Sequence, residues 1–511
     1  MNCSRRSFIK SLSLMGATGF MPALSCATAP KSLRNVICII GDDHAAHVMG
    51  CDHNDLAQTP NLDRLAGQGV RFTHAYANAP LCSASRQSLL TGKYPHATGV
   101  TLLTTSFPDD QLTLAEHLRE RGFATGVMGK THFNNGQDHG FSVLTDSKEW
   151  HEYLAANPPQ PAPKSIKTRP PWKPFRDPAR IWLNADGLPS EYHDKDDIGT
   201  WLAGESASFI REHKNDRFCL WVGFHEPHSP FNFPLEYANK YNPADMPLPP
   251  VSDEDDRWIP AIFRDLSDDD KRGIIASYYT SVAYMDKNVG IILDELDRQG
   301  LADETLVIYI GDQGYLLGHH KRFEKHMMWE QAVLSPLIMR AGKRFGPDRQ
   351  INGLCEFVDL APTILELLDI APLPDAQGQS LIPMLGGKQQ EIKDYVFSEF
   401  LADNKAMIRT RDWKYIFTSG KRDLGQGYAT GNPPSGILHR LYHVPTDPYE
   451  HHDVANDPEN QPILNEMQGM MLKHFMRTHP KANQLPTGLS VDEQLTWFCE
   501  PPDVGANLDA K

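Results

Sequence analysis

Asn35-Val36-Ile37-Cys38-Ile39-Ile40-Gly41 is a continuous apolar run with several β-branched residues, and it ends directly in Asp42-Asp43-His44. Such a run is typical of a strand that is buried on both faces, as in a parallel sheet. Ligands of open parallel sheets gather beyond the carboxyl ends of the strands, so two adjacent carboxylates at this end suggest a divalent cation. A solvated turn is the alternative for these two residues.

Later apolar runs predict further strands of the same sheet, at residues 70–75, 123–128, 218–224, 306–310 and 336–339. Helices are predicted between them, at residues 60–69, 114–121, 198–212 and 278–299. Strands that alternate with helices predict an α/β fold with a large mixed, mostly parallel sheet sandwiched by helices.

Three of these strands also end in polar residues. Gly129-Lys130-Thr131-His132 follows one strand, His225-Glu226-Pro227-His228 follows the next, and Gly311-Asp312-Gln313 follows a third. Because the carboxyl ends of parallel strands share one edge of a sheet, we expect these side chains to meet there. The cationic loop at residues 319–326 comes next and suggests an anion clamp, although a solvated charged face has the same composition.

Cys82 lies near the start of a predicted helix. Asn78-Ala79-Pro80 interrupts any preceding strand, and good helix formers continue from Ser83 to Leu90. The helix N-terminus favours negative charge there, and Arg86 adds a positive charge one turn later on the same face. We interpret Cys82 as the precursor of a nucleophile; the alternative is a buried, unreactive cysteine.

The length, charge and cysteine content limit the classes of protein to which the chain can belong. At 511 residues the chain is too long for one ordinary core, and its formal net charge of −15 argues against nucleic acid or an anionic membrane as partner. A few cations in a cleft still allow an anionic substrate. The eight cysteines include no C-x-x-C pair and no zinc-ligand spacing, so no disulfide framework is expected.

The first residues are predicted to be a leader. Ser4-Arg5-Arg6-Ser7-Phe8, followed by an apolar run at residues 11–24, is typical of a twin-arginine export signal. A membrane anchor is disfavoured because the run is short and interrupted by glycine and proline. Cleavage is expected between residues 25 and 30, with lipidation at Cys26 as the weaker alternative. We therefore expect export through the twin-arginine translocase to the periplasm or beyond the cell, with no stable membrane span.

Past residue 387 the pattern changes to short alternating strands, at residues 395–400, 406–410, 413–418 and 440–444, which indicate a small antiparallel sheet. A helix at residues 461–477 follows, with an apolar stripe at core spacing. The predicted domains are therefore the leader at 1–29, the catalytic α/β domain at 30–387 and a C-terminal α+β subdomain at 388–511. Within the α/β domain, the proline-rich stretch at residues 157–189 is expected to form a long loop that walls a cleft, or a plain irregular connection.

Taken together, these segments resemble the formylglycine-dependent sulfatases, a branch of the alkaline-phosphatase-like superfamily. The resemblance extends from about Asn35 to Asp453. Its motifs, in the order of that family, are Gly41-Asp42-Asp43, Cys82-Ser83-Ala84-Ser85-Arg86 with Leu90-Thr91-Gly92-Lys93, Gly129-Lys130-Thr131-His132, His225-Glu226-Pro227-His228-Ser229-Pro230, Asp312-Gln313-Gly314 and Glu324-Lys325. Each motif is weak alone, but their ordered set makes coincidence a poor explanation.

The resemblance implies that a maturation enzyme oxidises Cys82 to formylglycine (3-oxoalanine), which is then hydrated to a gem-diol. One hydroxyl would attack sulfur, and the second would expel sulfate as the aldehyde is restored. The resemblance also implies one cation, Ca2+, held by oxygen donors. Its ligands would be Asp42, Asp43, residue Cys82, Asp312 and Gln313, where Gln313 departs from the commoner Asn or His.

Further roles follow from the same resemblance. Arg86 and Lys130 would steady the diol, His132 would take the proton in the elimination step, and Lys325 with His228 would grip sulfate and protonate the leaving oxygen. Substrate contacts are expected at His225, His44 and Arg322, with His47, Glu226 and Lys321 as further candidates.

These observations predict an exported sulfuric ester hydrolase that acts on a sulfated carbohydrate. Aryl and choline sulfates are alternative substrates, and a phosphonate monoester or phosphodiester hydrolase of the same superfamily is the first alternative activity. A non-enzymatic glycan-binding homologue is disfavoured because every expected catalytic position is filled.

Overall fold

The computed structural model of the chain describes residues 32–174, 177–420 and 436–503. The predicted leader, with its cleavage and lipidation sites, lies outside the described residues. The described residues form one compact unit that contains two sheets. Among the described helices, none is long and apolar enough to cross a membrane.

The larger sheet has nine strands and is mostly parallel, which confirms the predicted fold class. Its strands are β1 (Asn35–Gly41), β2 (Val70–Tyr76), β3 (Ala124–Gly129), β4 (Val143–Thr145), β5 (Phe218–Gly223), β6 (Thr305–Gly311), β7 (Leu334–Ala341), β8 (Arg349–Ile351) and β9 (Cys355–Glu356). They are ordered β4-β3-β5-β1-β6-β7-β2-β8, with β9 beside β2. Of these nine, β7 runs against its neighbours β6 and β2, and every other pairing is parallel.

Fourteen α-helices occur in the described part of the chain. They are α1 (Pro60–Gly67), α2 (Cys82–Thr91), α3 (Pro95–Thr98), α4 (Leu114–Arg119), α5 (Ser147–Ala156), α6 (Ala179–Trp182), α7 (Ile198–Glu212), α8 (Ala261–Arg264), α9 (Asp268–Arg298), α10 (Glu330–Val333), α11 (Leu360–Leu367), α12 (Ile382–Leu385), α13 (Gln461–Thr478) and α14 (Val491–Phe498).

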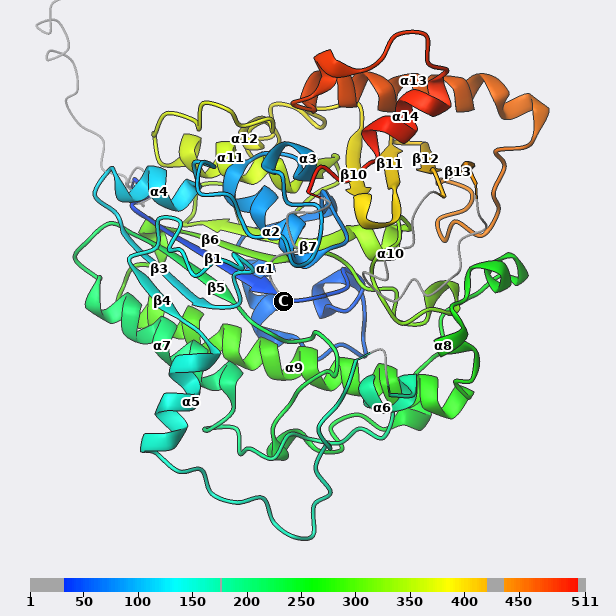
Figure 1. The fold of residues 1–511 in the computed structure, drawn as a ribbon. Coiled ribbons are helices and arrows are strands. Elements are labelled where there is room, and N and C mark those ends of the chain that lie inside the picture. Colours follow the sequence, from blue (N-terminus) through cyan, green and yellow to red (C-terminus); the bar gives the residue numbers. More distant parts are fainter. Residues whose placement is uncertain (1–31, 175–176, 421–435, 504–511) are drawn as a thin grey trace, which may run out of the picture. The chain divides into compact units, whose positions relative to one another are not determined.

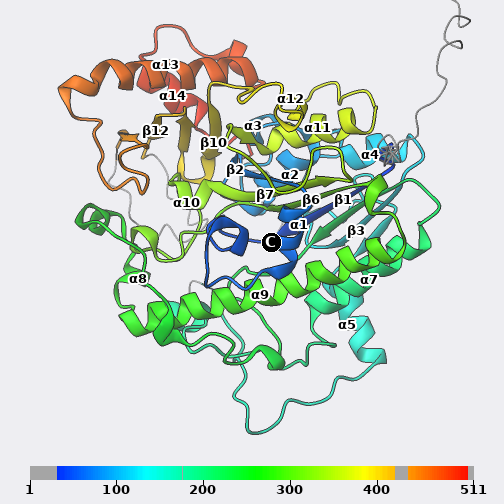
Figure 2. The ribbon, with the colours of Figure 1, turned by 180° about the vertical axis from the view of Figure 1, so that it is seen from behind.

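Helices cover both faces of the nine-stranded sheet, as Figures 1 and 2 show from opposite sides. Alternate residues of a strand point to opposite faces. In β1, Val36, Cys38 and Ile40 therefore pack with α2, α4, α11 and α12. The intervening Ile37 and Ile39 pack with α1, α7 and α9. Two hydrophobic layers thus bury the central strands completely and fix their carboxyl ends at one edge.

The smaller sheet consists of four antiparallel strands, as predicted: β10 (Val396–Phe400), β11 (Lys405–Arg409), β12 (Trp413–Thr418) and β13 (Leu438–His443). Helices α13 and α14 cover it, and the apolar stripe of α13, which contains Leu464, Met467, Met471 and Phe475, is buried against it. The domain boundary predicted after residue 387 falls between α12 and β10 and stays a prediction, since both sheets belong to one compact unit.

A buried ion-pair network links β12 to the first residue of α10 and to the segment after β13. Lys414 is completely buried, and its Nζ lies 3.0 Å from a Glu330 oxygen and 2.9 Å from a Glu450 oxygen. Glu450 also accepts a hydrogen bond from the Glu330 N–H. These charges are buried together, so each depends on the others for compensation.

The last described residues reach back to the N-terminal half of the chain. The Asp503 carboxylate accepts hydrogen bonds from the N–H groups of Thr101 and Leu102, at 2.9 and 3.1 Å, and from the hydroxyls of Thr101 and Thr105. The carbonyl of Leu102 in turn accepts from the hydroxyl of Ser83, at 3.1 Å. Asp503 therefore fixes a loop that contacts the first turn of α2.

Three local features were not predicted from the sequence. Helix α9 begins at Asp268 rather than at residue 278, because a capping box between Ser267 and Asp270 starts the helix before its apolar face begins. The side chain of Thr59 does not cap α1; its hydroxyl accepts a hydrogen bond from the Gly50 N–H instead. The tail beyond Pro480, for which no prediction was made, contains α14, capped by Ser490 and Glu493.

Candidate active site

Four adjacent parallel strands end at the same edge of the sheet and supply its polar residues. Gly41 of β1 pairs with Gly311 of β6, so Asp42 and Asp312 follow side by side. On the other side, β3 ends beside β5, which brings Lys130 and the loop after Phe224 to the same edge. The predicted convergence of strand ends is therefore present in the structure.

Cys82 lies at the first position of α2 and faces this edge. Its Sγ lies 2.8 Å from Lys325 Nζ, 3.3 Å from Asp42 Oδ1, 3.4 Å from Gln313 Nε2 and 3.8 Å from Asp43 Oδ1. The side chain is 1% exposed. Burial and the nearby carboxylates of Asp312 and Asp42 raise the pKa of this thiol above its ordinary value. The unmodified thiol is thus held protonated, which makes it a poor nucleophile as it stands.

Positive side chains balance the buried carboxylates. Arg86 donates from Nε to Asp312, at 2.9 Å, and from Nη1 to the Lys130 carbonyl, at 2.8 Å. Lys130 pairs with Asp42, and Lys325 pairs with Asp43. Burial opposes ionisation of Asp42, but Lys130, His228 and Arg86 outweigh it and hold the pKa of Asp42 well below its usual range.

The acidic residues can hold a metal ion. Asp42, Asp43, Cys82 and His228 each offer a ligand atom within 4.8 Å of the others. Two further observations favour a cation: Asp43 Oδ2 and Gln313 Oε1 are buried without a hydrogen-bond partner. Such orphaned oxygens are costly unless a cation satisfies them. The donor set therefore fits a divalent metal.

Both carboxylate oxygens of Asp312 accept hydrogen bonds from neighbouring residues of the site. One of its oxygens accepts from the Asp43 N–H, at 2.9 Å, and the other accepts from Arg86. Burial and the neighbouring Asp42 raise the pKa of Asp312 to about 7. Asp312 thus positions Asp43 and Arg86 in addition to being a predicted ligand.

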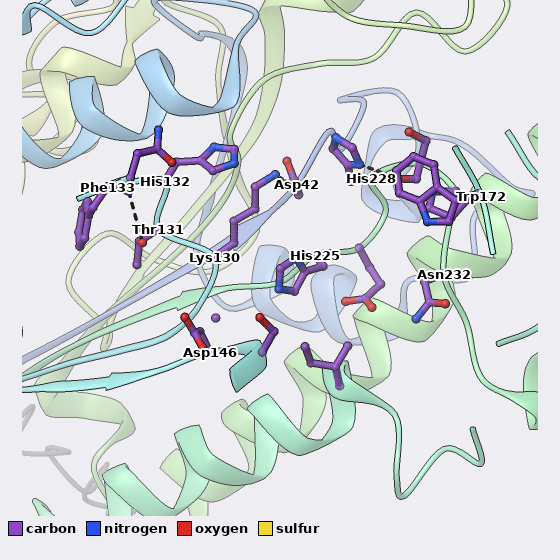
Figure 3. A pocket seen from close by; sticks show the side chains of 17 residues that line it. Asp42, Lys130, Thr131, His132, Phe133, Asp146, Trp172, His225, His228 and Asn232 are labelled. Carbon is purple, nitrogen blue, oxygen red and sulfur yellow. Dashed lines mark hydrogen bonds and ion pairs between the residues drawn. The ribbon is translucent and has the colours of Figure 1, made fainter. Parts of the chain in front are cut away.

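A cavity of about 570 Å³ opens beside Asp42 and Lys130 (Figure 3). In Figure 3, these two residues lie between His132 on one side and His228 on the other. Burial, together with Lys130 and Arg86, lowers the pKa of His132 well below its usual value, so its imidazole is neutral. His228 Nδ1 donates a hydrogen bond to the Ser229 carbonyl at 2.7 Å. The other ring nitrogen of His228, Nε2, lies 3.7 Å from Asp43 Oδ2.

Two of the predicted substrate contacts lie elsewhere. Both ring nitrogens of His44 are occupied, by the Tyr309 hydroxyl at 2.5 Å and the Val48 carbonyl at 2.9 Å, in a fully buried position. Arg322 is also buried and binds Glu324 and the Trp258 carbonyl. Neither lines the cavity, so both side chains stabilise the protein interior rather than contact a ligand there.

The other substrate candidates divide in the same way. His225 and Glu226 line the cavity. His47 instead packs edge-on against His319, and Lys321 binds Asp256. Glu226 is fully buried, its carboxylate oxygens have no hydrogen-bond partner, and burial together with Asp197 raises its pKa to about 8.

The cavity also has wall residues without a predicted role. Trp172, from the proline-rich loop, lines it as the loop prediction suggested, while Asp146 and Asn232 were not predicted. Asp146 directly follows β4, so the strand-end rule identifies it once that three-residue strand is known. Asn232 lies two residues beyond the His225–Pro230 motif, and its side chain lies near Asp197.

The arrangement combines a mostly parallel sheet covered by helices with acidic and cationic side chains at the ends of its strands. The solved phosphonate monoester hydrolase of Agrobacterium radiobacter shares the fold, with a TM-score of 0.74 over 88% of this chain and 97% of that one, at 22% identity. The Sulfatase family model matches residues 34–370, and the model of the N-sulphoglucosamine sulphohydrolase C-terminal region matches residues 318–477. The chain therefore belongs to the sulfatase family.

Two relatives match most of the chain. An N-acetylglucosamine-6-O-sulfatase of Bacteroides thetaiotaomicron is 28% identical over 456 residues, covering 77% of this chain and 80% of the relative. A choline-sulfatase of Rhizobium meliloti is 25% identical over 467 residues, covering 86% of each. Both are sulfatases, and the chain is an enzyme of this family.

Proposed function

We propose that the protein is an exported sulfuric ester hydrolase that removes sulfate from a sulfated carbohydrate. The observation that carries the proposal is the position of Cys82 Sγ, between Lys325 Nζ at 2.8 Å and Asp42 Oδ1 at 3.3 Å, beside the cavity. A group at this position has cations to bind an anion and carboxylates to bind a metal, which is what sulfate ester hydrolysis requires.

In this proposal Cys82 is converted to formylglycine, whose hydrated form supplies the nucleophile. Ca2+ supplies electrophilic assistance when it is bound by Asp42, Asp43, Asp312 and Gln313 with residue 82. Hard oxygen donors, including the orphaned oxygens of Asp43 and Gln313, favour Ca2+ over a softer metal.

The remaining side chains orient the sulfate group and move protons. Lys325 is 3% exposed and its ammonium, whose pKa the carboxylates around it raise despite burial, binds the anionic group. His228 lines the cavity and, in its imidazolium form, protonates the departing oxygen from Nε2. Lys130 and Arg86 hold residue 82 in orientation, and the neutral imidazole of His132 accepts a proton as residue 82 is regenerated.

The cavity wall supports a carbohydrate as the group that carries the sulfate. Trp172 offers an aromatic face, and Asn232, Glu226 and Asp146 offer amide and carboxylate groups. Sugars are bound by such combinations of an apolar ring surface with directed hydrogen-bonding groups. The N-acetylglucosamine-6-O-sulfatase relative supports the same choice.

A phosphonate monoester hydrolase is the second candidate function, because a solved enzyme of that activity shares the fold. Choline sulfate is an alternative substrate, since the Asp146 carboxylate and the aromatic face of Trp172 would attract its cationic group.

The proposal extends to maturation and export. The partners are a formylglycine-generating enzyme and the twin-arginine translocase, and the mature protein works in the periplasm or outside the cell. The pattern of paired arginines at Arg5 and Arg6 before an apolar run supports this route.

The test compares hydrolysis of defined sulfated oligosaccharides, an aryl sulfate, choline sulfate and an aryl phosphonate by the mature protein. We expect sulfate release from at least one oligosaccharide with a kcat/KM above that of the other three compounds. A higher kcat/KM for the phosphonate contradicts the proposed reaction, and a higher value for choline sulfate contradicts the carbohydrate. The Cys82→Ala protein is the matched control for background hydrolysis.

A further inference from the structure

A second group of metal-ligating side chains lies away from Cys82. Asp255 belongs to a short 3-10 helix, Asp253–Trp258; His320 lies in the turn His319–Lys321; and His451 follows β13. One ligand atom from each of the three lies within 4.8 Å of the other two. We infer that these residues bind a divalent transition-metal ion, Zn2+ or a close chemical relative.

The side chains are already held in place. His320 Nδ1 lies 2.7 Å from Asp255 Oδ1, and the other Asp255 oxygen accepts from the Ser252 N–H at 2.8 Å. The His320 ring stacks on Trp329, with 3.9 Å between ring centroids and 8° between the planes. A preorganised ligand set loses little conformational entropy when the ion binds.

The imidazole of His451 also favours a bound ion. Its Nε2 is buried and has no hydrogen-bond partner. His320 is completely buried and Asp255 is 3% exposed, so water does not readily compensate these groups. A buried polar atom without a partner needs an explanation, and a bound ion provides one.

The donor types select the kind of ion. Two imidazole nitrogens and one carboxylate are typical of Zn2+ sites with three protein ligands and one open position. Nitrogen donors distinguish this site from the oxygen-rich group at Asp42 and Asp43. The guanidinium of Arg440 stacks over Trp258 and Trp329 and brings a positive charge close to the site. An ion bound there would add more positive charge, so the negative charge of the Asp255 carboxylate is needed to neutralise it.

The ion would link three distant parts of the chain. His320 lies at the tip of a loop closed by the hydrogen bonds Leu316 N–H to Glu324 O and Gly318 N–H to Arg322 O, both 2.8 Å. Lys325 follows this loop directly. A metal bound at its tip would thus anchor the segment that carries Lys325 to the segment after β13.

The test measures metal binding rather than turnover. The mature protein is freed of metal, saturated with Ca2+ to occupy the oxygen-rich group, and titrated with Zn2+ or Co2+. We expect one equivalent of Zn2+ per chain by elemental analysis, visible absorption from Co2+ in a tetrahedral site, and a rise in melting temperature on addition of Zn2+.

The variants are His451→Ala and Asp255→Asn, with His452→Ala as the matched control. His451 is only partly buried, so its replacement removes a ligand without removing a core side chain. His452 is exposed, and its Nδ1 lies 3.9 Å from Glu254 Oε1. His451→Ala is expected to lose the bound equivalent, the Co2+ absorption and the Zn2+-dependent rise in melting temperature. His452→Ala and Cys82→Ala are expected to retain all three. Absence of a Zn2+ equivalent from the Ca2+-saturated wild-type protein overturns the inference, as does unchanged binding in His451→Ala.

Discussion

Replacement of Lys325 by methionine removes a buried cation from the reaction centre and keeps the length of the side chain. Lys325 Nζ lies 2.8 Å from Cys82 Sγ and contacts Asp43. A preorganised donor to a developing negative charge in a water-excluded site contributes about 2.7–4 kcal/mol, so kcat is expected to fall by about 10²–10³-fold. The loss should be similar for an aryl sulfate and a sulfated oligosaccharide, because both present the same sulfate group.

The assay is sulfate release at saturating substrate, with the formylglycine content of residue 82 measured by peptide mass in the same preparations. Lys414→Met is the control, since Lys414 is also a buried lysine between two carboxylates, Glu330 and Glu450. Removal of one partner of a buried ion pair costs about 3–5 kcal/mol of unfolding free energy. Lys414→Met should therefore be less stable yet retain kcat below its melting transition. A Lys325→Met enzyme with equal formylglycine content and kcat within tenfold of wild type refutes the role given to Lys325.

Cys82→Ala is expected to release no sulfate from any substrate while keeping the wild-type melting temperature within a few degrees; measurable turnover contradicts the assignment of the nucleophile position. Removal of divalent cations by a chelator is expected to abolish turnover, and Ca2+ should restore it better than Zn2+; full activity in the chelated protein contradicts the metal assignment. Trp172→Ala is expected to raise KM for sulfated oligosaccharides by about tenfold, as loss of an aromatic contact worth about 1–1.5 kcal/mol predicts, with little change for a small aryl sulfate. Equal effects on both substrates contradict the assignment of Trp172 to the carbohydrate.

The central strands and their polar ends can be predicted from the sequence, because a strand that is buried on both faces is a continuous run of apolar residues. The run Asn35–Gly41 is apolar at every position that two hydrophobic layers cover, and its end is marked by Asp42 and Asp43. The direction of a strand cannot be recognised in the same way. Nothing in the composition of β7 distinguishes an antiparallel strand from a parallel one, and its direction is set by packing between β6 and β2.

The substrate candidates show where prediction from sequence stops. His44 and His225 both follow buried strands closely, yet His44 is held inside by Tyr309 and Val48, while His225 lines the cavity. Side-chain direction in irregular loops depends on contacts from distant segments, so residue type and position alone do not determine it. Asp146 was missed for a related reason, because β4 has three residues and no periodicity that can be recognised.

The contact between Asp503 and the loop at Thr101 has a consequence for the order of events during synthesis. Residues 402 positions apart in the chain must meet before the loop against the first turn of α2 is fixed. A growing chain on the ribosome lacks the Asp503 carboxylate until residue 503 has been added. Any enzyme that modifies Cys82 before this contact forms therefore has the time that translation takes from residue 82 to residue 503 in which to reach it.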